Sequence, residues 1–194
     1  MANTIMPAFR EEAANQEGRI IGNILAGYGE LELELCGCLA AVNGDLDLSI
    51  RLLFQVRGEE RRLQTADKTL RTSCTNAGLG ALYCEIYADF DWCRQLRNQY
   101  AHSHWYYTGR DGLCIVKLEE LAKKKGPIGF LEASRLSIPL HLLIDQEAFL
   151  RTYRKASGIS AKPTLLGRHQ SPIRRYLHCP RDCRARKCTM EPPS

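Results

Sequence analysis

A long stripe of apolar residues is the feature of this sequence that most constrains its fold. Between residues 21 and 42, apolar side chains recur at steps of three and four, which places them on one face of a helix. The members of this stripe are Ile21, Ile24, Leu25, Tyr28, Leu31, Leu35, Leu39 and Val42. Such a helix must pack its apolar face against other elements, and 194 residues are enough to bury a core without disulfides or metals.

The same spacing continues along the chain and is interrupted by residues that end helices. Gly44 ends the first helix and Asp45 can cap the next one, while Gly58 and Gly78 mark two further breaks. These patterns predict helices over residues 46–56, 59–76, 82–102, 119–125 and 140–156.

The helical pattern changes after residue 104. Trp105–Tyr107 and Leu113–Val116 flank a glycine-containing turn at Thr108–Gly112, which predicts a β-hairpin, and residues 134–138 can add a third short strand. We therefore expect an all-α fold, an antiparallel helical bundle with a small inserted β-hairpin. A disordered basic C-terminal tail would follow it.

Charge divides the chain into a neutral body and a basic end. Residues 1–157 hold 19 Lys and Arg against 20 Asp and Glu, whereas residues 158–194 hold eight against two. This last segment has no helical spacing and carries five of the eight prolines. We divide the chain into an N-terminal extension (1–16), the bundle (17–157) and a tail without regular structure (158–194).

The sequence gives no sign of export or membrane insertion. No apolar run of signal-peptide length occurs near the start, and Glu30, Glu32 and Glu34 interrupt the most apolar stretch, so we expect a cytoplasmic protein. Six of the nine cysteines lie singly in apolar periodic segments, where a free thiol packs as a small hydrophobic group. Three tail cysteines follow His178 without the paired spacing of a zinc knuckle, and we expect neither a metal nor a cofactor.

One segment, residues 94–105, gathers hydrogen-bonding side chains at the end of a predicted helix. It contains two arginines, two histidines and two glutamines with an asparagine and a serine among them. One interpretation is a polar helix end, where His102 or His104 caps free carbonyl groups. Another is a site that binds and transforms a phosphate-containing ligand.

The second interpretation is strengthened by a resemblance. Residues 97–102, Arg-Asn-Gln-Tyr-Ala-His, resemble the R-x4-6-H motif of the HEPN superfamily, in the form in which a polar residue follows the arginine. This resemblance implies a small helical bundle, a homodimer and, in many members, a metal-independent endoribonuclease. Such nucleases include toxins and phage-defence effectors. Other members have lost catalysis and bind RNA, nucleotides or a protein partner such as an antitoxin.

The residue types suit cleavage of single-stranded RNA by its own 2′-OH group. His102 can transfer protons at cellular pH, and Arg97 can clamp the phosphate. Asn98 can orient His102 or the phosphate, which completes the predicted catalytic set. Arg94, His104 and Tyr100 are candidates for substrate binding, and His104 is also the rival to His102.

The geometry of an ideal helix raises a difficulty for this site. Arg97 and His102 are five residues apart and would point about 140° apart on a regular helix. Either the helix unwinds near residues 100–104 or, as the resemblance implies, two motifs meet across a dimer. An acidic residue of the first helix can pair with Arg94 or Arg97, although a solvated acidic face is the simpler interpretation.

Three interpretations therefore remain open at the level of sequence. The first is an active HEPN-type ribonuclease, and the second is an inactive HEPN-like dimeric module that binds RNA, a nucleotide or a protein. The third is an unrelated helical protein in which the motif arises by chance.

Overall fold

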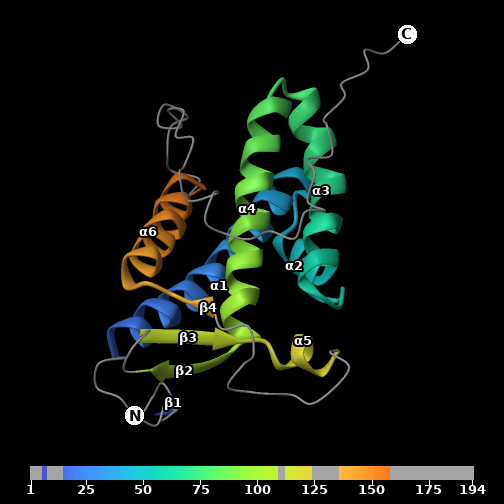
Figure 1. Cartoon of the computed structure of the whole chain (residues 1–194). Helices are drawn as coiled ribbons and strands as arrows, with labels where there is room; N and C mark the ends of the chain where they lie inside the picture. The colour runs from blue at the N-terminus through green and yellow to red at the C-terminus, as the bar shows by residue number, and fades with distance from the viewer. Residues whose placement is uncertain (1–5, 8–14, 109–111, 124–135, 158–194) are drawn as a thin grey trace.

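The computed structural model describes residues 6–7, 15–108, 112–123 and 136–157, and within these ranges the chain is mainly helical. Its four long helices run beside one another, with a small sheet across one end (Figure 1). The helices are α1 (Asn15–Asn43), α2 (Leu46–Phe54), α3 (Glu59–Asn76), α4 (Gly80–Ala101), α5 (Leu118–Ala122) and α6 (Leu140–Ser157). The prediction of a helical bundle with an inserted hairpin is confirmed.

Contacts between the long helices give the direction in which each one runs. Tyr83 of α4 donates to Asp67 of α3 while Arg97 pairs with Glu59, so these two helices are antiparallel. In contrast, Asn23 of α1 donates to Glu147 of α6 at 2.8 Å, and one turn later Gly27 lies against Leu150. Helices α1 and α6 therefore run parallel, because the sheet returns the chain to the end where α1 begins (Figure 1).

The core is built from the apolar stripe of α1. Ile21, Ile24 and Leu31 are completely buried and pack against residues of α4, α6 and the sheet. A second cluster at the other end joins α1 to α2, α3 and α4 through Leu39, Leu53 and other apolar side chains. A Cβ atom at Gly27 would clash with the Leu150 side chain, so this glycine is what allows α1 and α6 to approach so closely.

The sheet has four antiparallel strands in the order β1 (Met6–Pro7), β2 (His104–Thr108), β3 (Gly112–Val116) and β4 (Leu136–Ser137). Strands β2 and β3 form the predicted hairpin, in which Trp105 pairs with Ile115. The short strand expected within residues 134–138 is present as β4. Strand β1 comes from the N-terminal extension, where the sequence pattern gave no strand signal.

Two helix starts follow from local chemistry. The Asp45 carboxylate accepts from the Leu48 backbone N–H at 3.0 Å, which confirms the predicted cap of α2. Gly58 precedes α3 with a φ of 89°, a conformation that other residues rarely adopt. The positive φ of Gly58 thus allows the sharp turn that brings Glu59 to the start of α3.

The predicted tail (158–194), with His178 and its three cysteines, lies outside the described residues. Among the cysteines that are described, Cys36, Cys93 and Cys114 are buried and all six are free thiols. Burial raises the pKa of the Cys93 thiol, as expected of a cysteine that packs as an apolar group. Within the described ranges, no helix is long and apolar enough to cross a bilayer.

Candidate functional site: an arginine-lined groove at the end of helix α4

Helix α4 ends within the motif that the sequence singled out. Its last helical residue is Ala101, and His102 follows as the C-cap with its backbone N–H still bonded to the Asn98 carbonyl at 3.1 Å. The next two carbonyls accept from side chains: Ser103 donates to Gln99, and the Trp105 indole donates to Tyr100 at 3.0 Å. The free carbonyls of this helix end are thus capped without the histidines.

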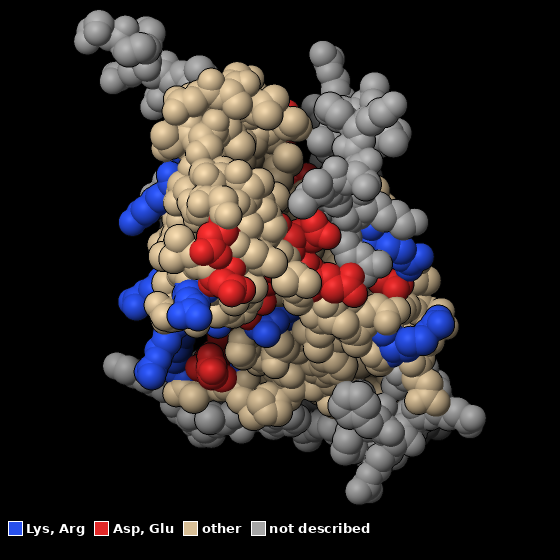
Figure 2. Space-filling view, turned by 180° about the vertical axis from the view of Figure 1, so that it is seen from behind, with Lys and Arg blue, Asp and Glu red and all other residues tan. Residues whose placement is uncertain are grey.

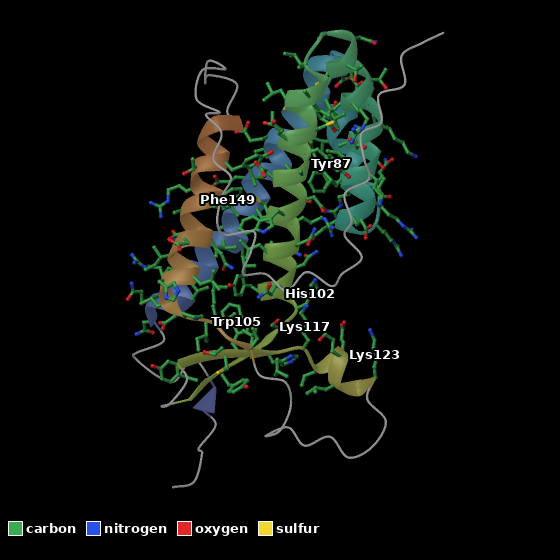
Figure 3. All side chains as sticks on the ribbon, turned by 45° about the horizontal axis from the view of Figure 1, so that its top comes forward. Tyr87, His102, Trp105, Lys117, Lys123 and Phe149 are labelled. Atoms are coloured by element: carbon green, nitrogen blue, oxygen red, sulfur yellow. The ribbon has the colours of Figure 1, made fainter. Side chains whose placement is uncertain are left out.

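The His102 side chain is exposed where the chain leaves α4 for the sheet (Figure 3). Within the described part of the chain, no protein group forms a hydrogen bond with its imidazole. His102 therefore occupies the C-cap position through its backbone, whereas its imidazole does not cap the free carbonyl groups as one interpretation expected. The imidazole remains available to a ligand.

Arg97 and His102 line the same open groove, although they are five residues apart on the chain. The regular helix stops before His102, so the angle of about 140° expected for a continuous helix does not apply. This is the first of the two expected solutions, in which the helix unwinds near residues 100–104. The opposite wall is formed by the α2–α3 connection and the first turn of α3. The residues that line the groove are Arg57, Gly58, Glu59, Glu60, Arg61, Arg62, Arg94, Arg97, Asn98 and His102.

Arg97 is held by one of its terminal nitrogens. Its Nη1 forms an ion pair with Glu59 Oε1 and also donates to Asn98 Oδ1 at 2.9 Å. Its guanidinium carbon lies 5.9 Å from the centre of the Tyr28 ring, within the range of a cation–π contact. No hydrogen bond within the described residues uses Nε or Nη2, so that edge of the fork is free to bind two oxygens of one phosphate.

Two other arginines of the groove, Arg94 and Arg62, are already paired with carboxylates. Arg94 donates through Nε and pairs through Nη2 with Asp91 Oδ1, at 2.8 and 2.7 Å. Arg62 pairs with Glu32 of α1 at 3.0 Å. The acidic residue of α1 thus meets an arginine, but the partner is Arg62 rather than the expected Arg94 or Arg97.

Arg57 and Arg61 differ from these because both are exposed and neither side chain bonds to another described residue. They lie four residues apart on either side of Gly58 and the first turn of α3. Their guanidinium groups add positive charge to the groove. The described lining holds five arginines and two glutamates, and Asp91 and Glu32 offset two of these arginines, so a small excess of positive charge remains to attract anions.

Two of the predicted substrate-binding residues lie elsewhere. Tyr100 is 1% exposed, packs against Trp105 and donates to Gln146 of α6, so it belongs to the core and does not reach a ligand. Its polarity suggested a site, but a buried tyrosine needs a bonding partner for its hydroxyl group in any case. His104 is exposed on β2, outside the described lining of the groove.

Sequence reasoning missed the α3 side of the groove. Around Arg57, Glu59, Arg61 and Arg62, the sequence pattern predicted only a helix break at Gly58 and a helix over residues 59–76. The usable signal was the density of arginines around that glycine, with Arg57 and Arg61 four residues apart. Only the antiparallel packing of α3 on α4 brings this cluster opposite Arg97.

Figure 2 shows basic and acidic side chains on the same face of the molecule. Acidic side chains gather near the middle and most basic ones lie toward the two sides, several of them together on the left. This agrees with the balanced charge of the body. Comparison with family models, curated proteins and solved structures finds no match to this chain.

Proposed function

We propose that the arginine-lined groove binds the backbone of single-stranded RNA and cleaves it without a metal ion, in the manner of a HEPN-type endoribonuclease. One observation carries this proposal. Arg97, Asn98 and His102, selected from the sequence as a motif, line one groove together with Arg57 and Arg61, two arginines whose side chains bond to no other described residue.

The side chains of the groove suit each requirement of the reaction. The free edge of Arg97 would hold the scissile phosphate and offset the charge that develops on its oxygens. His102 would transfer a proton, a role that imidazole groups commonly have in catalysis. Asn98 would keep Arg97 in place through the hydrogen bond to Nη1. Arg57 and Arg61 would bind neighbouring phosphates.

A second candidate is a module that binds RNA or a nucleotide without cleaving it. The ion pair between Arg97 and Glu59 favours this alternative, since a carboxylate already offsets the charge of the arginine. A homodimer, an antitoxin partner and a role as a toxin or defence effector are further expectations of the HEPN resemblance. The chemistry proposed here needs none of them, because both residues line the groove from one chain.

The test is cleavage of fluorescent single-stranded RNA by the purified full-length chain in excess EDTA. We expect products with a 5′-OH and a 2′,3′-cyclic phosphate or 3′-phosphate. His102→Ala is expected to lower the rate by about 10²–10⁴-fold, the usual contribution of a positioned acid or base. Arg97→Ala is expected to lose a similar factor through the missing phosphate clamp.

His104→Ala is the matched control, since His104 is a nearby exposed histidine outside the described lining of the groove. A loss of cleavage in His104→Ala but not in His102→Ala would refute the assignment of the motif. No cleavage by the wild-type chain, with or without divalent metal, would leave the binding module as the better candidate. RNA affinity of the same variants then measures that alternative directly.

A further inference from the structure

Among the described residues that line the groove, His102 alone carries an imidazole, whereas the proposed reaction requires two proton transfers. One group must take the proton of the attacking 2′-OH, and another must give a proton to the departing 5′-oxygen. His102 can perform one of these steps. The second group must come from the other side chains that reach the scissile phosphate.

Glu59 is the carboxylate closest to the phosphate-binding position in the groove. It is the first residue of α3, and Gly58 turns its side chain toward α4, where Oε1 pairs with Arg97 Nη1. A phosphate bound to Nε and Nη2 of Arg97 would therefore be separated from this carboxylate only by the guanidinium group. The side chain is 15% exposed, and its second oxygen, Oε2, is buried and has no hydrogen-bond partner within the described residues.

The other ionisable groups around Arg97 are less suited to accept a proton. Glu60 also lines the groove, but it is exposed, its Oε1 accepts a hydrogen bond from Gln64 at 3.2 Å, and it forms no ion pair with Arg97. Glu32 is engaged by Arg62. Burial, together with the nearby carboxylates, raises the pKa of Tyr28, so its hydroxyl group keeps its proton. Arginine has no acceptor atom and does not lose a proton in proteins.

We propose that Glu59 is the general base of this site and that His102 is its general acid. The inference rests on the proposed function of the groove and assigns the second catalytic residue to it. It differs from a design with two histidines, because one carboxylate and one imidazole divide the two proton transfers between them.

In the proposed reaction, two protons move and one bond to phosphorus replaces another. Glu59 takes the proton from the 2′-OH while the 2′-oxygen forms a bond to phosphorus. The bond from phosphorus to the 5′-oxygen breaks, and the protonated His102 gives its proton to that oxygen. The products are a 2′,3′-cyclic phosphate and a 5′-OH, with Glu59 protonated and His102 neutral. Exchange of two protons with water restores the starting state.

Access to the carboxylate depends on the bound phosphate. Without a ligand, Oε1 pairs with Arg97 and Oε2 is buried. A phosphate on Arg97 supplies negative charge that competes with Glu59 for the guanidinium, and in the proposed complex this competition releases Oε1 toward the groove.

The pH dependence of the reaction depends on every charged group that faces Glu59. Arg97 of α4 pairs with it, Arg94 and His102 line the same groove, and Tyr28 and Glu32 of α1 contact Arg97 and Arg62. The groups on the same wall as Glu59 are Arg57, Glu60, Arg61 and Arg62. The variants below leave all of these in place except the one under test.

The first experiment compares Glu59→Gln with Glu85→Gln, a control at an exposed glutamate of α4 outside the described lining of the groove. Glu59→Gln keeps an oxygen that can accept from Arg97 but cannot take a proton. We expect it to lower kcat/KM by about 10²–10⁴-fold and to remove the acidic limb of the pH profile. Glu85→Gln is expected to change kcat/KM less than about threefold and to keep that limb, as is usual for a surface substitution.

The second experiment separates the base from the acid with an activated substrate, uridine 3′-(4-nitrophenyl phosphate). Its leaving group departs without a proton, so His102→Ala should lose much less activity on this substrate than on RNA. Glu59→Gln should lose a similar factor on both substrates, since both still require deprotonation of the 2′-OH. Glu59→Asp keeps a carboxylate and should retain the acidic limb that Glu59→Gln loses.

Three results would overturn the assignment while leaving the proposed function intact. In the first, Glu59→Gln cleaves RNA as fast as the wild-type chain or faster, which would mean that Glu59 competes with the phosphate for Arg97. In the second, Glu59→Gln recovers on the activated substrate, which places Glu59 on the leaving-group side. In the third, the Gln and Asp variants share one pH profile, as expected of a positioning residue. A wild-type chain that cleaves no RNA overturns both proposals together.

Discussion

The last turns of α4 have two sides that the sequence does not distinguish but the fold treats in opposite ways. On one side, Leu96 and Tyr100 are fully buried among side chains of α1, α6 and the sheet. On the other, Arg97 and His102 line an open groove against the start of α3. Both sides carry groups that can form hydrogen bonds, yet only one of them offers such groups to a ligand.

The difference between the two sides lies in what each polar group contacts. The Tyr100 hydroxyl group bonds to Gln146, which is itself completely buried. The His102 imidazole has no bonding partner within the described residues, and the Arg97 fork uses one of its edges. Some polar residues of a motif thus form hydrogen bonds inside the core, and others can bind a ligand. Only the contacts of each side chain in the folded structure show to which group it belongs.

The largest effect on stability is expected at Leu96, on the buried side. Leu96→Ala removes a completely buried side chain and should lower the free energy of unfolding by about 2–5 kcal/mol. Urea denaturation measures this loss. His102→Ala is the matched variant on the groove side and should stay within about 0.5 kcal/mol, because its imidazole is exposed and unbonded. Equal losses would remove the distinction between the two sides.

A smaller effect is expected at Tyr100, where polarity serves the core. Tyr100→Phe leaves the buried Gln146 Oε1 without its donor and should cost about 1–3 kcal/mol. Cleavage by the folded protein should not change. The double variant Tyr100→Phe with Gln146→Met removes both partners and should recover part of the lost stability. A selective loss of RNA binding in Tyr100→Phe at unchanged stability would show that Tyr100 contributes to the binding site.

The smallest effect is expected at Arg61, on the exposed wall of the groove. Arg61→Gln should weaken RNA binding modestly and lower the slope of log K against log salt by about 0.7, the value for one phosphate contact on a single strand. Arg51→Gln is the matched control, since Arg51 is exposed on α2 outside the described lining of the groove. The same change in slope for both variants would indicate diffuse attraction rather than a specific groove.

Much of the bundle was readable from local patterns. The apolar stripe of α1, the Asp45 cap, the break at Gly58 and the hairpin around residues 105–116 all appear where the sequence predicted them. Each of these signals acts within a few residues, through helix periodicity, capping or turn chemistry. Strand β1 carries no such signal, because a strand of two residues depends entirely on the partner with which it pairs.

The sequence by itself determined that this chain is mainly helical and that residues 94–102 concentrate groups capable of phosphate chemistry. Tertiary structure decided which of those groups face outward. It buried Tyr100 against α6, ended α4 so that Arg97 and His102 share a groove, and brought Glu59 and the arginines of α3 opposite them. The physical reason is distance along the chain: Glu59 and Arg97 meet only because α3 and α4 pack antiparallel, and no local pattern records that contact.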